Sequence, residues 1–203
     1  EFVGPDTDIP APDVGTGAQE MAWFVDEYEK LHGYAPGVVT GKPVDLGGSL
    51  GRDAATGRGT VLAVREILKL ADAGDISGKT FVVQGFGNVG SWVARLLAEL
   101  GGKVVAVGGS AGGVYHPAGL NMAQGFRVRE DKPKSFSGFA GEPVSNEELL
   151  ALECDVLIPA ALGGVIHDGN AASVKAKVVA EAANHLIIQE VPENMTRMQE
   201  LIK

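Results

Sequence analysis

The sequence has little of what several classes of protein require. It contains one cysteine, Cys154, among 203 residues, so no internal disulfide can form. No apolar run comes near the ~20 residues of a membrane-spanning helix, and the first residues do not resemble a leader peptide. Lysine and arginine total 17 against 26 aspartates and glutamates, which disfavours a nucleic-acid or anionic membrane surface. These absences predict a cytoplasmic, soluble protein with a reduced cysteine.

Histidine is sparse as well. The four histidines are scattered, with no pair four residues apart and no cysteine nearby, so we expect no metal site. Cys154 precedes an apolar strand pattern and is expected to be a small buried apolar residue.

Glycine, in contrast, is abundant. The chain has 29 glycines, about twice the usual share. They fall in clusters without a collagen-like period, which predicts repeated tight turns where the backbone comes close to a ligand. Hydrophobic residues make up 45% of the chain, so a buried core is expected.

Hydrophobic periodicity alternates between short apolar runs and helical patterns. A Thr16–Gln19 capping box is expected to start a helix that Gly33 ends, and 37–40 reads as a short strand. Residues 41–59 predict an ordered loop and 59–73 a helix. Further strands are expected at 80–84, 103–107, 155–159 and 177–181. This order predicts an α/β, Rossmann-like, doubly wound and mostly parallel sheet with helices on both faces.

The glycine motif at residues 85–90 follows an expected strand and opens an expected helix. Gly85 permits a tight turn, Gly87 removes a side chain where a phosphate would lie, and Gly90 lets helix and strand pack closely. A glycine turn alone occurs in many α/β proteins, but this strand–turn–helix–strand context favours dinucleotide binding. The whole chain, 1–203, is therefore expected to form one dinucleotide-binding domain, with residues 1–15 as an extended N-terminal arm.

The acidic residue that usually binds the adenosine ribose is missing. It is expected near the end of the second strand, but no acidic residue occurs between Glu99 and Glu130. Either the site tolerates a 2′-phosphate, with Gly109 and Ser110 among the donors, or the site is degraded. The cofactor is therefore predicted to be NAD or NADP, and the balance favours NADP slightly.

Six strings in the chain are long, ordered and individually unusual. They are Asp8 to Thr16, Val39 to Pro43, Gly47 to Arg52, Ala55 to Gly59, Gln84 to Gly90 and Ala180 to Asn184. Together they closely resemble the cofactor-domain half of the glutamate dehydrogenases, in the Glu/Leu/Phe/Val dehydrogenase family. The resemblance is collinear from about Gly4 to His185.

The resemblance implies an oligomeric enzyme that converts L-glutamate to 2-oxoglutarate and ammonia with NAD or NADP. It implies that Asp13 is the proton-shuttling carboxylate at the cleft. Cofactor contacts implied by the resemblance are Arg52, Thr56, Gly85, Phe86, Gly87, Asn88, Val89, Ala160 and Asn184.

Three departures from the family pattern limit this expectation. The substrate domain with its catalytic lysine has no counterpart in the chain, residues 186–203 form a divergent tail, and Gly108-Gly109 replace the usual Ser-Asp. We therefore expect no turnover from the isolated chain. The alternative is a catalytically silent, stand-alone or engineered binding or scaffold module.

Several of these residues also have simpler interpretations. Asp13 could serve only the start of the helix after it, and Arg52 and Arg58 could pair with nearby aspartates. The resemblance favours ligand contact for Arg52 and leaves Arg58 open. Lys42, between Gly41 and Pro43, is expected to be structural rather than a catalytic base.

Overall fold

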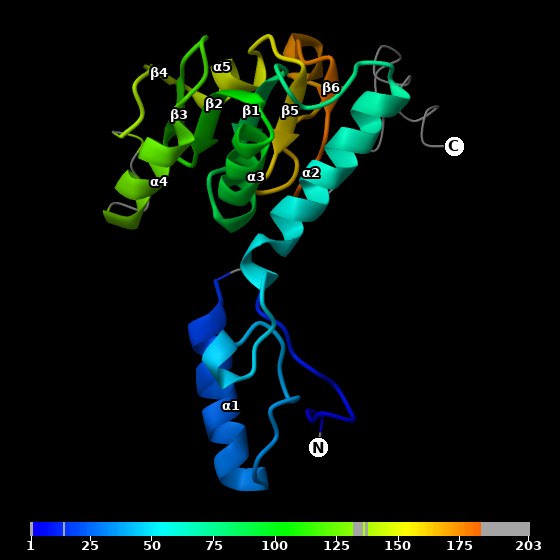
Figure 1. The fold of residues 1–203 in the computed structure, drawn as a ribbon, viewed down its shortest axis with the longest axis vertical. Coiled ribbons are helices and arrows are strands. Elements are labelled where there is room, and N and C mark those ends of the chain that lie inside the picture. Colours follow the sequence, from blue (N-terminus) through cyan, green and yellow to red (C-terminus); the bar gives the residue numbers. More distant parts are fainter. Residues whose placement is uncertain (1, 14, 132–135, 137, 184–203) are drawn as a thin grey trace. The chain divides into compact units, whose positions relative to one another are not determined.

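The computed structural model describes residues 2–13, 15–131, 136 and 138–183. The chain forms two compact units, Glu1–Asp53 and Ala54–Lys203. From the sequence, residues 1–203 were expected to form one domain. Figure 1 shows the order of the elements along the chain.

The first unit contains the helix α1 (Ala18–His32) and the short 3-10 helix η1 (Val44–Leu46). Met21 and Val25 of α1 are buried together with Val38 and Val39. Gly33 ends α1 at a φ of 81°, in the left-handed region that glycine enters without steric cost, and its N–H donates to Glu29. The predicted end of this helix is therefore confirmed.

Two details of the first unit differ from the sequence prediction. The residue that caps α1 is Gly17, and the carboxylate of Glu20 accepts from its N–H at 2.7 Å, so the predicted Thr16–Gln19 capping box is wrong by one residue. Thr16 instead uses its hydroxyl to accept from the N–H of Asp13 at 2.8 Å. Residues 37–40 form a turn with a buried valine pair rather than the predicted strand.

The second unit is built on a six-stranded mixed sheet in the order β4-β3-β2-β1-β5-β6. Strands β2, β1, β5 and β6 are mutually parallel, and β3 and β4 extend one edge antiparallel. Their bounds are β1 Thr80–Gln84, β2 Lys103–Gly109, β3 Gly112–Tyr115, β4 Glu142–Val144, β5 Val156–Pro159 and β6 Val178–Val179. The predicted α/β class with a mostly parallel sheet is confirmed.

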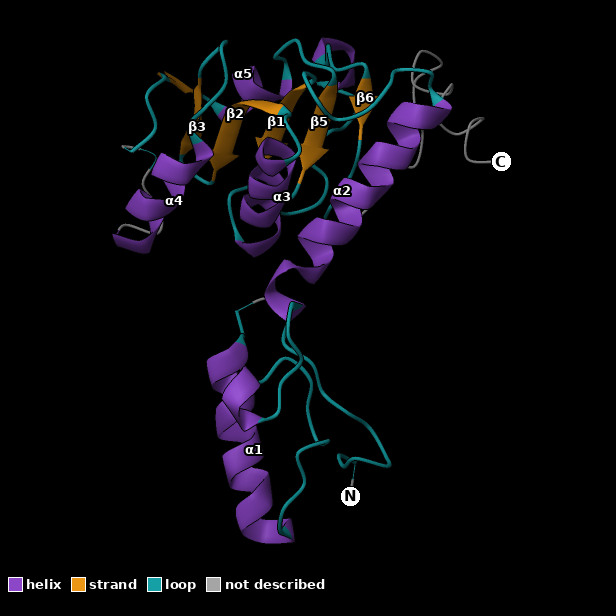
Figure 2. Cartoon of the chain, viewed as in Figure 1, coloured by secondary structure: helices purple, strands orange, loops and turns teal. Residues whose placement is uncertain are grey.

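Helices lie on both faces of this sheet. One face carries α2 (Arg52–Leu70) and α3 (Asn88–Glu99), and the other carries α5 (Asn146–Leu150). Figure 2 shows α3 in front of the sheet and α5 behind it. The remaining elements are α4 (Met122–Asp131) and the 3-10 helix η2 (Ala171–Ser173). The sequence between 108 and 141 predicted at most a short helix, whereas α4 has 10 residues.

The helix α2 begins seven residues earlier than the sequence predicted, so residues 52–58 are helical rather than part of a loop. The glycines at 57 and 59 led to the prediction of a loop, because glycine is less favourable in a helix than alanine by about 1 kcal/mol. Gly57 is needed for packing, since a Cβ there would come within 2.7 Å of the Cβ of Trp92 in α3. The two helices therefore approach closely at this point.

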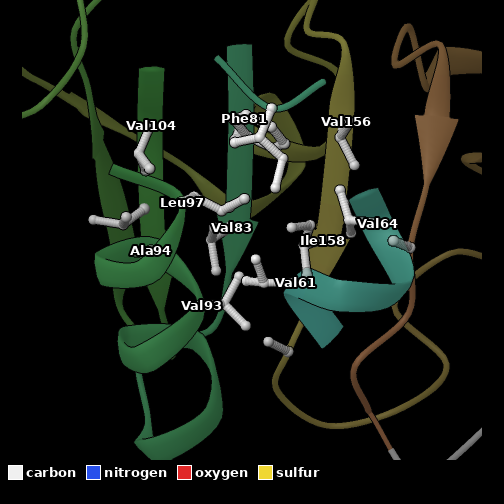
Figure 3. Packing of buried hydrophobic residues seen from close by; sticks show 14 of the residues in the cluster. Val61, Val64, Phe81, Val83, Val93, Ala94, Leu97, Val104, Val156 and Ile158 are labelled. Atoms are coloured by element: carbon white, nitrogen blue, oxygen red, sulfur yellow. The ribbon is translucent and has the colours of Figure 1, made fainter. Parts of the chain in front are cut away.

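The main core lies between the sheet and α2 and α3. Val61 and Val64 from α2 and Val93 and Leu97 from α3 pack in one cluster with Phe81 and Val83 of β1 (Figure 3). Phe81 is fully buried. Side chains alternate along β1, so Val82 faces the opposite cluster beneath α5. Burial on both faces explains why these strands read as continuous apolar runs.

Two further features were predicted from the sequence. The Ser145–Glu148 capping box at α5 is confirmed, with the Ser145 hydroxyl accepting from the N–H of Glu148 and the Glu148 carboxylate accepting from the N–H of Ser145. These bonds lower the pKa of the Glu148 carboxyl.

Within the described part of the chain, no helix is both long and apolar enough to cross a membrane.

Asp155 joins three strands at the amino end of the sheet. Its carboxylate accepts from the N–H and hydroxyl of Thr80 at 2.9 and 3.0 Å, and from Nζ of Lys177 at 2.8 Å. Partial burial is the largest single influence on the Asp155 pKa and would raise it, but the bonds from Lys177 and Thr80 together lower that pKa to about 2.

We predict that Asp155→Asn destabilises the chain in a pH-dependent way. The folded-state pKa lies below the unfolded value, so the ionised carboxylate stabilises the fold above about pH 4, and this is lost as the pH falls toward 2. At pH 7 the variant should lose about 1–2 kcal/mol of unfolding free energy, measured in urea. A loss that does not shrink between pH 4 and pH 2 would contradict this origin.

Candidate functional site

The glycine turn lies at the carboxyl edge of the parallel strands. It joins the end of β1 to the start of α3, and β1 is flanked by β2 on one side and β5 on the other. The chain leaves β1 toward β2 and later returns to β5 on the opposite side, so the strand order reverses here. Ligands of open α/β sheets bind outside the carboxyl ends of strands at such a reversal.

Each glycine of the turn has a different steric role. Gly85 has a φ of 98°, and a Cβ there would lie 2.7 Å from the carbonyl of Ala160 after β5. A Cβ on Gly90 would overlap the carbonyl oxygen of Gly85. Gly87 is exposed, and among the described residues a Cβ there would meet nothing within 4 Å. Two glycines therefore permit close packing, and the third leaves open space beside the helix.

The start of α3 suits an anion. Gly87 is the N-cap residue and has no side chain that could accept from the first turn, and no acidic residue lies in that turn. The first N–H groups of a helix have no partner within the helix and carry its partial positive charge. Asn88 is exposed and Val89 half-buried in this turn. The start of a helix with these features is the kind of place where proteins bind phosphate groups.

The side chain of Phe86 does not face this space. Its ring packs against Phe126, Phe136 and Phe139, with centroid distances of 5.8, 5.9 and 5.7 Å. We call these four residues the phenylalanine cluster. Phe86 can therefore contribute its backbone to a ligand while its ring is engaged within the protein. Sequence reasoning missed the other three rings, because no local motif links them to the turn.

The end of β2 adjoins the turn. The N–H of Gly85 donates to the carbonyl of Gly108 at 2.9 Å, and Gly109 follows as the last residue of β2. A Cβ on Gly109 would lie 3.4 Å from the ring of Phe136, and Ser110 is exposed. The structure therefore brings the predicted residues Gly109 and Ser110 to the same edge as the turn.

Two buried amide oxygens near this edge were not identified from the sequence. Within the described residues, Oε1 of Gln84 and Oδ1 of Asn146 have no hydrogen-bond partner. Gln84 is 7% exposed and ends β1 directly before the turn. Oδ1 of Asn146 lies 3.6 Å from the position of a Cβ on Gly108. The sequence offered one signal for Gln84, because a polar residue there ends an otherwise apolar strand. It offered no comparable signal for Asn146.

The remaining cofactor residues divide between described and undescribed parts. Ala160 is buried, packs against Gly85 and donates its N–H to the carbonyl of Gln84 at 2.6 Å. Arg52 and Thr56 are exposed in the first turns of α2, not in a loop as the sequence predicted. Asn184 lies outside the described residues, as do the extended segment and helix predicted within 186–203.

Asp13 belongs to the first unit and is exposed. Its carbonyl accepts from the N–H of Thr16 at 2.9 Å and from the Thr16 hydroxyl at 3.0 Å, which fixes the backbone of the turn. Lys42 donates from Nζ to the carbonyl of Val39 at 2.9 Å. This contact is consistent with the structural role expected for Lys42.

Cys154 lies just before the amino end of β5, whereas the glycine turn follows the carboxyl end of β1. Burial raises the pKa of the Cys154 thiol to about 12, and the neighbouring Asp155 charge adds to the effect. The thiol is therefore un-ionised near neutral pH and is a poor nucleophile. Among residues 2–13, 15–131, 136 and 138–183, no group of three or more histidine, cysteine, aspartate or glutamate residues could hold a metal ion.

The fold and the turn define an α/β protein with a strand–glycine-turn–helix unit at a strand-order reversal. The family model described as Glutamate/Leucine/Phenylalanine/Valine dehydrogenase matches residues 47–199. A second model, Glu/Leu/Phe/Val dehydrogenase, dimerisation domain, matches residues 1–30. The chain therefore belongs to the Glu/Leu/Phe/Val dehydrogenase family, as the resemblance predicted. The first match includes most of 186–203, which sequence analysis set apart as divergent.

Individual relatives support the same assignment. The chain is 46% identical over 198 residues to a glutamate dehydrogenase of Thermotoga maritima, covering 97% of this chain and 47% of the relative. The structure matches a hetero-hexameric glutamate dehydrogenase from Thermus thermophilus in a leucine-bound form, with a TM-score of 0.83, 38% identity and coverage of 99% and 46%. It matches the Peptoniphilus asaccharolyticus glutamate dehydrogenase with a TM-score of 0.71, 34% identity and coverage of 98% and 46%. The chain thus spans about half the length of these relatives.

We predict opposite stability effects for two alanine substitutions in the turn. Gly90→Ala should cost about 2 kcal/mol or more, because its Cβ would overlap the Gly85 carbonyl oxygen. Gly87→Ala, the matched control, should change stability by less than about 1 kcal/mol, because its Cβ enters open space at an allowed φ of -74°. Urea unfolding measures both. Equal losses would show that the turn is not packed as described.

Proposed function

We propose that the chain is the Rossmann-like, dinucleotide-binding half of an NAD(P)-dependent glutamate dehydrogenase. The observation that carries this proposal is the division of roles within the glycine turn. Gly85 and Gly90 are required for close packing, whereas Gly87 leaves the space that a diphosphate needs. A glycine turn with only a packing role would not need a glycine at position 87.

In this proposal the backbone from Gly85 to Val89 holds the pyrophosphate at the start of α3. Arg52 and Thr56 contact the cofactor from the start of α2, and Ala160 and Asn184 lie beside the nicotinamide ribose and ring. The bound dinucleotide supplies a hydride acceptor for the α-hydrogen of the substrate. The residues of the chain orient that acceptor and keep the diphosphate in place.

In the complete enzyme, L-glutamate is oxidised and hydrolysed to 2-oxoglutarate and ammonia. We propose that the Asp13 carboxylate moves a proton during this reaction, because Asp13 stands in a string that resembles the family's catalytic segment. The complete protein is proposed to be a homo-oligomer, whereas the Thermus relative is described as a hetero-hexamer. Its cytoplasmic location remains a prediction from composition.

The choice between NAD and NADP depends on the end of β2. Gly108, Gly109 and Ser110 at this end of β2 have no carboxylate to accept from a ribose hydroxyl or to repel a 2′-phosphate. Gly109 and Ser110 supply donors at this edge, which favours NADP slightly.

We expect NADP or NAD to raise the melting temperature of the chain. A ligand at 100 times its Kd adds about 2.7 kcal/mol, which corresponds to a shift of about 5–10 °C for a domain of this size. Gly87→Val should abolish the shift with little change in the melting temperature of the free chain, because its side chain enters the diphosphate space. Absence of any shift with millimolar dinucleotide would contradict the proposal.

An assay of glutamate-dependent reduction of NAD or NADP tests whether the chain alone catalyses the reaction or only binds the dinucleotide. We expect no measurable turnover by the purified 203-residue chain, because it spans about half the length of its relatives. Appreciable turnover would contradict the proposal that this chain supplies only the dinucleotide-binding half of the enzyme. A silent chain that binds no dinucleotide would instead favour the scaffold alternative.

A further inference from the structure

We propose that Phe139 is a positioning residue for dinucleotide binding, acting on the glycine turn through the ring of Phe86. The inference rests on the proposed function, because it assigns a role in holding the same diphosphate. It concerns a residue 53 positions after Phe86 along the chain (139 − 86).

The contact between the two rings is direct. The centroids of Phe86 and Phe139 are 5.7 Å apart and the rings meet edge to face at 77°, an arrangement that favours aromatic pairs. Phe86 lies between Gly85, which turns tightly against Ala160, and Gly87, which faces open space. Its ring is therefore the one large side chain between the first two glycines of the turn.

Phe139 is itself held firmly. It is 7% exposed, and its ring occupies the space that a Cβ on Gly125 of α4 would fill. The neighbouring α4 residue Phe126 also contacts Phe86, and the guanidinium of Arg95 in α3 lies 5.8 Å from the Phe126 ring. The ring of Phe139 therefore contacts both α4, at Gly125, and the glycine turn, at Phe86.

The phenylalanine cluster also reaches the end of β2. The ring of Phe136 lies 5.9 Å from that of Phe86 and 6.4 Å from that of Phe139, and it is close to Gly109. One group of rings therefore contacts both the turn after β1 and the last residue of β2. These are the two places where a diphosphate and an adenosine ribose would meet the sheet.

This packing has a specific consequence for binding. A diphosphate requires several backbone N–H groups at fixed relative positions, and ordering them at the moment of binding would reduce affinity. Gly85 and Gly87 give the turn little stiffness of its own. The Phe86 ring, held by Phe139, restricts the turn before the ligand arrives. Loss of the contact should therefore weaken ligands with a diphosphate more than ligands without one.

The test is a double-mutant cycle with Phe86→Leu, Phe139→Leu and the double variant, in the 203-residue chain. The Kd of NADPH is measured by fluorescence, and those of ADP and adenosine by competition. Each single substitution should raise the Kd of NADPH and ADP about five- to tenfold and that of adenosine less than about twofold. The double variant should resemble the single variants, because both remove the same ring contact.

Leu97→Ala is the matched control. Leu97 is fully buried in the same core cluster, at the end of α3 remote from the turn. It should lower stability while changing the Kd of ADP less than about twofold. Phe139→Met, which keeps an unbranched apolar side chain in place, should restore part of the affinity and serves if Phe139→Leu folds poorly.

The outcomes separate the two proposals. If the unaltered chain binds neither NADPH nor ADP, the proposed function fails. If it binds both, any of three results overturns the inference. The Kd of ADP could be unchanged in Phe139→Leu, or the increases in Kd of the two single variants could multiply in the double variant. Leu97→Ala could also raise the Kd of ADP as much as Phe139→Leu does. A loss confined to diphosphate ligands, shared by both phenylalanine variants, supports it.

Discussion

The close approach of Gly90 to the carbonyl of Gly85 is the constraint on which the rest of the site depends. It allows the first turn of α3 to lie directly against the end of β1. A side chain at residue 90 would push α3 away from the end of β1, which lies between β2 and β5 in the sheet. The anion site that we propose therefore depends on backbone packing rather than on charged side chains.

The hydrophobic core between α2, α3 and the sheet holds α3 in place. Val93 of α3 lies in one core cluster with Phe81 and Val83 of β1, and Gly57 lets α2 approach α3 at Trp92. Asp155 joins β1, β5 and β6 at the opposite end of the sheet. The amino end is therefore closed by a charged hydrogen-bond network, while the carboxyl end presents glycines and open space. This division separates the residues that stabilise the sheet from those proposed to bind a ligand.

Local patterns predicted the parts of the molecule that local chemistry determines. The apolar runs predicted β1, β2 and β5, Gly33 predicted the end of α1, and Ser145 with Glu148 predicted the start of α5. The start of α2 was not predictable in this way, because its glycines are explained by a contact with Trp92 in another helix. The phenylalanine cluster was missed for the same reason.

Family membership, in contrast, followed from strings of residues that the comparisons then confirmed. The same strings predicted the glycine turn, and the structure explains each glycine in it by a separate contact or space. The roles of Asp13 and Asn184 depend on the resemblance, since Asp13 lies in the first unit and Asn184 lies outside the described residues.

An amide-resolved NMR titration of the chain with ADP tests the central claim most directly. We predict that the N–H signals of Gly87, Asn88 and Val89 shift together and saturate, because these groups start the helix that we propose receives the diphosphate. Signals at the amino end of the sheet, such as Thr80, should stay unchanged. Saturable shifts elsewhere, with none at residues 87–89, would contradict the account.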